Sequence, residues 1–269
     1  MRTRPLLSLT VGMLASFLAT TGCTRATPSA TGRAGGLPLH VAAASDLQLA
    51  LPEVVSQFQR SSPEPKVVLT FGSSGQLAEQ IKAGAPFDLF LSANTAFVSD
   101  LAAEHHINPE SVRPYAIGKV VIVFGFEQFG KVARIEDLAK PEVAKVAIAN
   151  PRHAPYGMAA KQALERAGLW EVVEPKIVPA DTVGQAMQFV QSGNAEVGLV
   201  SKAVASAPEI RALDVDPRLH DPLVQSLGIV SSTKAFQAAE SFARFLTGEA
   251  GRAVLRSHGF DLPPLSNTP

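Results

Sequence analysis

Two stretches of the chain share one arrangement, in which an apolar strand is followed by a serine-containing turn of small residues and then by an amphipathic helix. They are residues 39–58, LHVAAASDLQLALPEVVSQF, and residues 67–81, VVLTFGSSGQLAEQI. The serine stands where the helix begins, so backbone N–H groups without a partner inside the helix lie at the carboxyl end of the strand. A helix start of this kind attracts anions. The arrangement favours an α/β fold and predicts an oxyanion site where the strands end.

The alternation of strand and helix continues along the chain. Apolar runs predict strands at residues 39–43, 66–71, 89–92, 120–124, 146–149, 177–178, 196–200 and 227–230. Apolar residues at helical spacing, or a glycine that ends the segment, predict helices at residues 47–58, 76–83, 158–167 and 183–191. This order implies mostly parallel sheets flanked by helices. Ligands of such folds bind at the carboxyl ends of the strands, where the serine turns lie.

Composition excludes one large class of function. The chain has 24 Lys and Arg residues against 24 Asp and Glu residues, and only 6% of its residues are aromatic. Nucleic-acid-binding proteins use a basic surface and aromatic stacking, so we do not expect nucleic acid as a partner. The sequence also has no G-x-x-x-x-G-K-[ST] loop for a nucleotide.

The first residues have the features of an export signal. Two arginines precede the apolar residues 5–19, a run that is short for a membrane span. Cys23 follows a glycine as in a bacterial lipobox, although threonine stands where leucine is usual, so we expect a signal peptide over residues 1–23 and lipidation of Cys23. Ordinary cleavage after a small residue such as Ala26 is the alternative, and it leaves a soluble protein. Either way we expect an exported protein without a disulfide, with residues 24–37 as a flexible tether.

Serine or threonine opens three of the expected helices. Ser45, Ser73 and Thr182 are each followed three residues later by glutamine, which is the spacing of a capping box. Capping alone explains such residues without any ligand, but their repetition at equivalent strand ends favours a binding role. Asp46 follows Ser45 directly. Because a carboxylate would repel an anion, we expect Asp46 to face away from the site.

The segment NPRHAPYG, residues 150–157, is expected to form a loop between a strand and a helix. Tyr156 lies at the helix start with its N–H free, and its hydroxyl adds a donor or closes a lid. His153 is expected to be solvated, because no His or carboxylate residues converge with it at metal spacing. A hydrolase built from Ser45, His153 and Asp181 is disfavoured, because the sequence has no G-x-S-x-G motif. We therefore expect no enzymatic activity.

Several longer strings carry a resemblance to a known family. AAASDL, FGSSGQLAEQI, GAPFDLFLSA, YAIGKVV, ANPRHAPYG and ADTVGQAM occur in matching order and spacing, and with them the chain resembles the periplasmic molybdate-binding proteins of ABC importers, the ModA family. The resemblance covers residues 39–262 and is nearest to the branch with a P-Y-G loop. It implies a two-lobed periplasmic-binding-protein fold of type II with two hinge crossings, near residues 116–118 and 225–228. The first lobe would hold residues 38–116 and 226–269, and the second residues 117–225.

The resemblance also implies a ligand set. By their places in the matching strings, Ser45 and Ser74 would bind molybdate through their hydroxyls, and Tyr156 and Val183 through their backbone N–H groups. Ser201 stands where the family often has a tyrosine donor, and its hydroxyl reaches less far. The implied function is capture of molybdate, and of tungstate, for an ABC permease and its ATPase. The implied protein is a periplasmic or lipid-anchored monomer without a cofactor.

The sequence leaves the identity of the anion open. None of the matched positions is Lys or Arg, and neutral donors suit a fully deprotonated dianion such as molybdate. Phosphate carries a proton at neutral pH and would need an acceptor, whereas sulfate is proton-free but smaller, so the size of the cavity must decide. An enzyme on the same bilobal fold, such as a porphobilinogen-polymerising deaminase, needs a cysteine that carries its cofactor. The single cysteine lies in the signal region, which argues against that reading.

Overall fold

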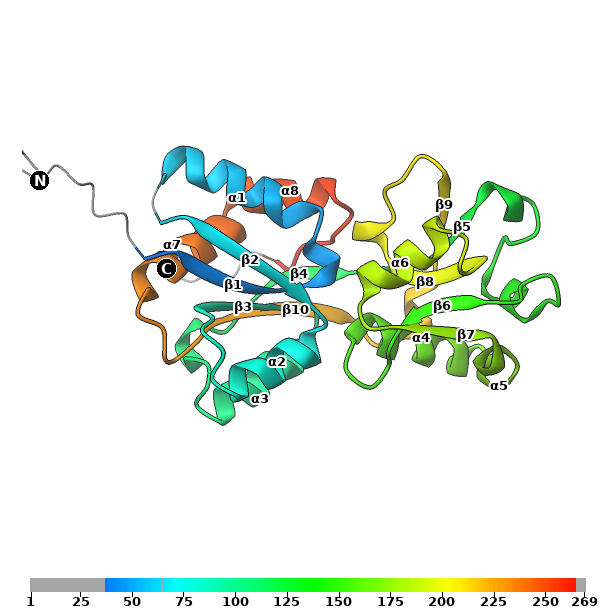
Figure 1. Ribbon diagram of the computed structural model, residues 1–269, viewed down its shortest axis with the longest axis horizontal. Coiled ribbons are helices and arrows are strands. Elements are labelled where there is room, and N and C mark those ends of the chain that lie inside the picture. Colours follow the sequence, from blue (N-terminus) through cyan, green and yellow to red (C-terminus); the bar gives the residue numbers. More distant parts are fainter. Residues whose placement is uncertain (1–36, 64, 265–269) are drawn as a thin grey trace, which may run out of the picture. The chain divides into compact units, whose positions relative to one another are not determined.

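The computed structural model of the chain describes residues 37–63 and 65–264, and Figure 1 shows two sheets flanked by helices. The first sheet consists of β1 (Leu39–Ala44), β2 (Val67–Gly72), β3 (Leu89–Ser92), β4 (Arg113–Gly118) and β10 (Leu223–Ile229). The second consists of β5 (Val120–Gly125), β6 (Val146–Ala149), β7 (Ile177–Ala180), β8 (Val197–Ser201) and β9 (Ile210–Asp214). The signal peptide, Cys23 and nearly all of the expected tether lie outside the described residues.

The two sheets repeat one topology. Their strand orders are β2-β1-β3-β10-β4 and β7-β6-β8-β5-β9. In the first sheet β10 runs antiparallel to both of its neighbours, and in the second sheet β5 does. The other strands of each sheet therefore run in one direction, which confirms the expected α/β fold with mostly parallel sheets.

Each sheet has its own helices. Those that pack with the first sheet are α1 (Ala50–Ser61), α2 (Ser74–Lys82), α3 (Thr95–Ala103), α7 (Phe236–Thr247) and α8 (Glu249–Ser257). Those of the second sheet are α4 (Pro155–Arg166), α5 (Trp170–Val173) and α6 (Val183–Gln191). Short 3-10 turns connect several elements, among them η1 (Ser45–Leu47), η3 (Phe126–Gln128) and η6 (Lys202–Val204).

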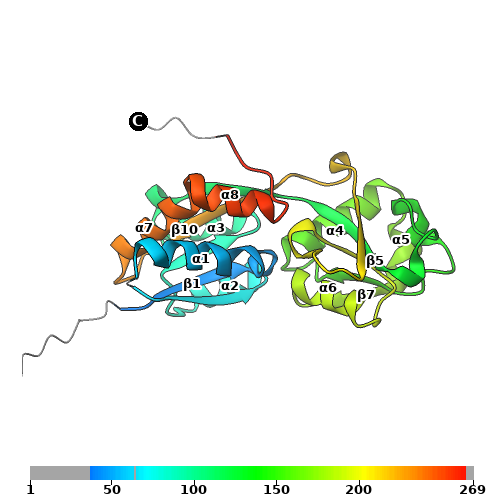
Figure 2. The ribbon, with the colours of Figure 1, turned by 90° about the horizontal axis from the view of Figure 1, so that it is seen from above.

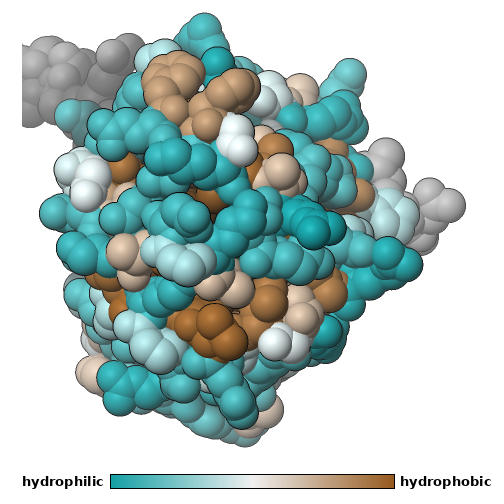
Figure 3. All heavy atoms as spheres, turned by 90° about the vertical axis from the view of Figure 1, so that its right-hand side faces the viewer, coloured by the Kyte–Doolittle hydropathy of each residue, from teal (hydrophilic) through white to brown (hydrophobic). Residues whose placement is uncertain are grey.

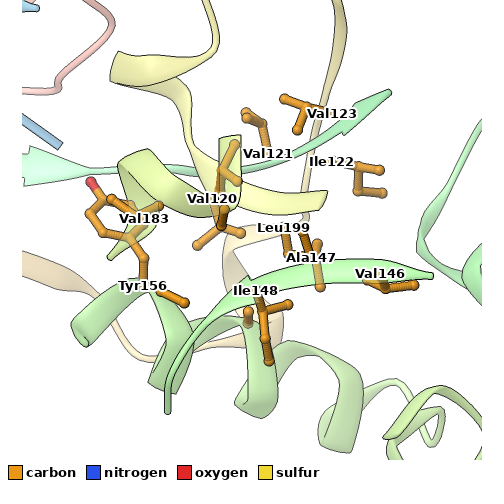
Figure 4. Close-up of a cluster of buried hydrophobic side chains, with 14 of the residues drawn as sticks. Val120, Val121, Ile122, Val123, Val146, Ala147, Ile148, Tyr156, Val183 and Leu199 are labelled. Carbon is orange, nitrogen blue, oxygen red and sulfur yellow. The ribbon is translucent and has the colours of Figure 1, made fainter. Parts of the chain in front are cut away.

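The strands at the centre of the second sheet are apolar on both faces because α4 and α6 pack against them. Residues of β5, β6 and β8 are buried almost without exception, as expected for strands covered on both sides. Figure 4 shows part of this core, with Val120, Ile148 and Leu199 among its side chains. Tyr156 lies at its edge beside Val183, and its hydroxyl points away from the aliphatic side chains.

The chain passes between the sheets twice (Figure 2). Only Lys119 separates β4 of the first sheet from β5 of the second, close to the first expected crossing. The return passage lies between Asp214 at the end of β9 and Leu223 at the start of β10. Residues 225–228, where the second crossing was expected, lie inside β10, because Gln225 already pairs with Ala116 of β4.

Two strands were not expected from the sequence, and both lie at a sheet edge. These are β4, which contains Pro114, and β9. Proline cannot donate a ladder hydrogen bond and glycine weakens a strand, so the sequence RPYAIG reads poorly as a strand. An edge position tolerates such residues, because only one side of the strand needs a complete ladder.

The first helix begins later than the sequence suggested. Ser45 and Asp46 belong to the 3-10 turn η1, and α1 starts only at Ala50. Pro52 explains the delay, because proline fits the first turn of a helix but breaks its interior. A helix that began at Ser45 would place Pro52 inside it. The predicted capping box at Ser45 is therefore wrong, since no side-chain cap bond forms there.

The surface carries few large apolar side chains. The face shown in Figure 3 is mainly hydrophilic, with separate brown groups among teal ones. Among the residues from β5 to β9, the exposed large hydrophobic side chains are Phe126, Phe129 and Val172. Among the helices that the structure describes, none combines the length and the apolar character needed to cross a membrane.

Candidate anion-binding site

A small cavity lies where strand ends and helix starts from both sheets come together. Its volume is about 10 Å³, which is close to the least that holds one water molecule. It is lined by Ala44, Ser45, Asp46, Gly72, Ser73, Ser74, Ala93, Ala154, Pro155, Tyr156 and Val183. A cavity of this size holds about one water molecule, so a tetrahedral oxyanion would enter only if the cavity walls moved apart.

Three α-helices begin at this cavity. Ser74 is the first residue of α2, Val183 is the first of α6, and Tyr156 is the second of α4. The N–H groups in the first turn of a helix have no partner within the helix, and the helix dipole adds partial positive charge there. None of the lining residues is Lys or Arg. The positive potential in the cavity therefore comes from backbone dipoles rather than from cationic side chains.

Two serine hydroxyls complete the donor set. Ser74 is fully buried, and its Oγ accepts a hydrogen bond from the backbone N–H of Ala93 over 3.0 Å. Because that contact uses a lone pair of the oxygen, the hydroxyl proton stays available to a ligand. Ser45 is also buried and lines the same cavity at the end of β1.

Ser201 is not among the lining residues of the cavity. It is fully buried at the end of β8, where its Oγ accepts from the backbone N–H of Ala203 over 3.2 Å and caps η6. Its hydroxyl is also one of the neighbours that lower the pKa of Tyr156. The structure thus places Ser201 behind Tyr156, and four of the five predicted ligand residues, Ser45, Ser74, Tyr156 and Val183, around the cavity.

Asp46 is one of the residues that line the cavity, although its side chain was expected to face away from the ligand. Its side chain is completely buried and the residue lines the cavity. Its Oδ2 accepts from the Tyr156 hydroxyl over 3.0 Å and from Gln225 Nε2 over 2.5 Å. Tyr156 and Gln225 follow Asp46 by 110 and 179 positions in the sequence. This separation is why no local pattern indicated the burial of the Asp46 carboxyl group.

Burial dominates the electrostatics of Asp46. It raises the pKa of the carboxyl group from 3.8 to about 6, although Gln225 and Tyr156 lower the pKa by hydrogen bonding. The backbone N–H groups of Asp46 and Leu47 also lower it. Within the described part of the chain, however, Oδ1 has no partner at normal hydrogen-bond geometry. Asp46 therefore has side-chain hydrogen-bond donors on only one of its two carboxyl oxygens. The residues that line the cavity include no Lys or Arg.

A chain of buried polar groups holds Asp46 in place. Tyr115 of β4 donates from its hydroxyl to Gln225 Oε1 over 2.7 Å, and Gln225 Nε2 lies 3.1 Å from the Tyr156 hydroxyl. Burial raises the pKa of Tyr115 and that of Tyr156 well above the usual value, so both phenols keep their protons. Gly118 also contributes, because a Cβ there would collide with the Tyr156 hydroxyl.

A second set of contacts joins the two sheets on the other side of the cavity. The backbone N–H of Gly75 in α2 donates to the carbonyl oxygen of His153 over 2.9 Å, and Ser73 Oγ lies 2.8 Å from His153 Nδ1. His153 is therefore half-buried and bonded rather than solvated as expected. Ser73 Oγ also bonds to Gln76 Oε1 and makes no cap bond to the backbone, so the predicted capping box at Ser73 is wrong.

The predicted cap at Thr182 is confirmed. Its Oγ1 accepts from the backbone N–H of Gln185 over 3.1 Å. The Gln185 side chain in turn accepts from the backbone N–H of Asp181. This arrangement fixes the start of α6, whose first residue, Val183, lines the cavity.

The whole described core matches one family. Residues 39–261 match bacterial extracellular solute-binding proteins. The chain belongs to this family. The solute-binding proteins it resembles include the molybdate-binding protein ModA of Rhodobacter capsulatus, with 31% identity over 85% of this chain and 96% of that protein. ModA of Azotobacter vinelandii is 32% identical over 83% of this chain and 90% of its own. The resemblance to the ModA family is thereby confirmed.

Solved structures agree with the assignment of this chain to the solute-binding proteins. The periplasmic molybdate-binding protein of Azotobacter vinelandii superposes with a TM-score of 0.78 at 32% identity, over 84% of this chain and 99% of that chain. The sulfate-binding protein SubI of Mycobacterium tuberculosis superposes with a TM-score of 0.72 at 14% identity, over 85% of this chain and 88% of that chain. The latter likeness shows the shared fold alone.

Sequence reasoning missed the groups that act behind the cavity wall. It did not single out Gln225 or Tyr115, and it assigned no structural contact to His153. Gln225 lies within the apolar run of β10, where a buried amide in the middle of a strand is a signal that it has partners. No comparable signal marks His153, whose contact with Ser73 joins residues 80 positions apart.

Proposed function

We propose that this protein captures molybdate, and also tungstate, for an ABC importer. The observation that carries the proposal is the convergence of three helix starts and two serine hydroxyls on one small cavity without Lys or Arg. The names of the relatives from Rhodobacter capsulatus and Azotobacter vinelandii support molybdate as the ligand. The work of such a protein is selection and closure around the anion rather than chemistry, so we propose no catalytic role and no cofactor.

The donor set suits a tetrahedral dianion. Molybdate and tungstate are fully deprotonated at neutral pH, so every oxygen is an acceptor and every contact should be an N–H or O–H donor. Hydrogen bonds to a charged group contribute about 1.5–3 kcal/mol each. A handful of such bonds, less the cost of ordering the ligand and closing the site, is enough for submicromolar affinity.

Sulfate and phosphate are the alternative ligands. Sulfate offers the same chemistry in a smaller ion, so only the fit of the closed cavity separates it from molybdate. Phosphate carries a proton at neutral pH, and that proton would need an acceptor in the cavity. The unpaired Oδ1 of Asp46 is a buried acceptor that could serve, which keeps phosphate within the test.

The remaining parts of the proposal concern location and partners. The family is extracellular, and a Bacillus subtilis relative, 30% identical over 94% of this chain and 97% of its own, is assigned to the substrate-binding lipoproteins of ABC transporters. Together with the lipobox-like sequence at Cys23, this supports a periplasmic or membrane-anchored protein, which we propose to act as a monomer. We propose that it delivers its anion to a permease with an associated ATPase.

A thermal-shift panel with molybdate, tungstate, sulfate and phosphate tests the proposal. A ligand that binds the native state raises the melting temperature with its concentration. We expect a large shift with molybdate and with tungstate and none with the other two. A shift with sulfate or phosphate alone would reassign the ligand, and no shift with any of the four would overturn the proposed function.

A further inference from the structure

Among the described residues that line the cavity, Asp46 is the one with a carboxyl group. Both of its side-chain hydrogen bonds fall on Oδ2, from Tyr156 and Gln225. The other oxygen, Oδ1, is buried and has no partner of normal geometry among the residues that the structure describes. A buried polar atom without a partner is costly, so such an atom in a binding site indicates a contact that forms with the ligand.

An ionised Asp46 is incompatible with a dianion in this cavity. Two negative groups in contact repel strongly where water is excluded, and no Lys or Arg lines the cavity to offset them. The donors on Oδ2 cannot turn toward the ligand, because Tyr156 and Gln225 are themselves held in the buried network. A proton on Oδ1 removes the conflict, because a protonated carboxyl group donates a hydrogen bond.

We propose that Asp46 binds the oxyanion through a proton placed between its Oδ1 and a ligand oxygen, so that capture of a dianion takes up one proton from solution. This inference rests on the proposed function, because it takes a proton-free dianion as the ligand. It makes Asp46 a specificity-determining residue that contacts an oxygen of the anion. The proton belongs to Asp46, since molybdate itself carries none at neutral pH.

The surroundings of Asp46 single it out as the group that takes up the proton. The elements packed most closely on η1 are α6, β2 and η6, and Tyr156 of α4 and Gln225 of β10 bond to the Asp46 side chain. Of these, α6 and β2 contain no titratable side chain, and Lys202 of η6 is paired with Asp214 over 2.8 Å. The phenols of Tyr156 and Tyr115 also face Asp46, and burial raises the pKa of each. His153, whose Nδ1 lies 2.8 Å from Ser73 Oγ, is a further ionisable side chain near the cavity and needs its own control variant.

Calorimetric titration of the intact protein with molybdate tests the proposal, in pairs of buffers that differ in ionisation enthalpy and contain no oxyanion. We expect uptake of nearly one proton at about pH 7.5, because the carboxyl group with a pKa of about 6 is then ionised before binding. The apparent affinity should fall roughly eightfold between about pH 6.5 and about pH 7.5. Binding without proton uptake would overturn the inference and leave the proposed function standing. The absence of any binding would overturn both.

Two variants assign the proton. In Asp46→Asn the amide donates permanently from the same place, so we expect affinity that does not vary with pH and no proton uptake. Affinity at about pH 7.5 should then be roughly thirtyfold higher than in the unmodified protein, because no proton has to be recruited by a carboxyl group with a pKa of about 6. His153→Gln keeps a polar partner for Ser73 and removes the imidazole ring. Proton uptake should persist in this variant, and its loss there would assign the proton to His153 and overturn the proposal.

Discussion

The backbone N–H of Gly75 donates to the carbonyl oxygen of His153 over 2.9 Å, and this bond joins the start of α2 to the loop before α4. It therefore links the two sheets directly beside the cavity. The approach is close because Gly75 has no side chain: a Cβ there would lie 2.7 Å from the same oxygen. Real Cβ atoms do not come so near to a carbonyl oxygen, so the contact depends on glycine.

Substitution Gly75→Ala should therefore weaken ligand binding by opening this contact. We expect the affinity for molybdate to fall at least tenfold, which corresponds to about 1.4 kcal/mol, because the cavity can no longer close fully around the anion. Calorimetry measures the affinity, and small-angle scattering with saturating molybdate measures the closure. Gly125→Ala is the matched control, since a Cβ there meets nothing within 4 Å and the φ of −77° suits any residue. Equal affinities of the two variants would contradict a role for the contact between Gly75 and His153.

Ser74→Ala removes a hydroxyl that has two tasks. The substitution removes a hydrogen-bond donor that would contact the ligand, so we expect at least a tenfold loss of affinity for molybdate. It also leaves the buried N–H of Ala93 without its partner, which costs about 1–3 kcal/mol of stability. Calorimetry and urea unfolding measure the two effects separately.

Ser111→Ala is the control that separates stability from binding. Ser111 is a buried serine outside the cavity, and its Oγ accepts from the backbone N–H of Ile229 over 2.8 Å. We expect a similar loss of stability in this variant with unchanged affinity for molybdate. If Ser111→Ala weakened binding as much as Ser74→Ala did, the effect at Ser74 would reflect stability and not ligand contact.

The start and end of α6 could be predicted from the sequence because their signals are local. Val183–Gln191 was expected with its observed bounds, since Thr182 caps it and Ser192-Gly193 follows it. The same local reasoning failed at Ser45, because a proline seven residues later controls where α1 begins.

The burial of Asp46 could not be predicted in this way. Local reasoning correctly noted that a carboxylate repels an anion, and from this it placed the side chain outside. The structure instead buries the carboxyl group against Tyr156 of α4 and Gln225 of β10. A pairing that spans 110 or 179 positions leaves no periodic trace in the sequence near Asp46.

Removal of the Tyr156 hydroxyl should raise the pKa of Asp46 further. In Tyr156→Phe the carboxylate loses a donor that lowers its pKa, while burial stays the same. We expect the pKa to rise above about 6 by roughly half a unit to one unit, given the usual strength of such a bond. Carbon-13 NMR of the aspartate carboxyl groups, with Asp46→Asn to assign the signal, measures the shift.

Tyr115→Phe provides the matched comparison for that titration. This substitution also removes a buried phenolic hydroxyl from the same network. The Tyr115 hydroxyl, however, donates to Gln225 and not to Asp46. The pKa of Asp46 should therefore change much less in Tyr115→Phe than in Tyr156→Phe. Equal shifts would mean that the network acts as a unit and that the direct bond from Tyr156 has no special weight.

Asp46 should also make the stability of the ligand-free protein depend on pH. Because its pKa is raised on folding, from 3.8 to about 6, the folded state binds the proton more tightly than the unfolded state. Stability due to this group is therefore complete below about pH 4, decreases as the pH rises through about 6, and stays reduced above that. For a shift of this size the loss is on the order of 2–3 kcal/mol.

Asp46→Asn has no charge to bury, so its free energy of unfolding relative to the unmodified protein should be higher at about pH 7.5 than at about pH 4.5. Urea unfolding of both proteins at the two pH values measures this difference, with molybdate omitted so that binding does not contribute. A difference between the proteins that is the same at both pH values would show that the carboxyl group titrates alike in the folded and unfolded chain.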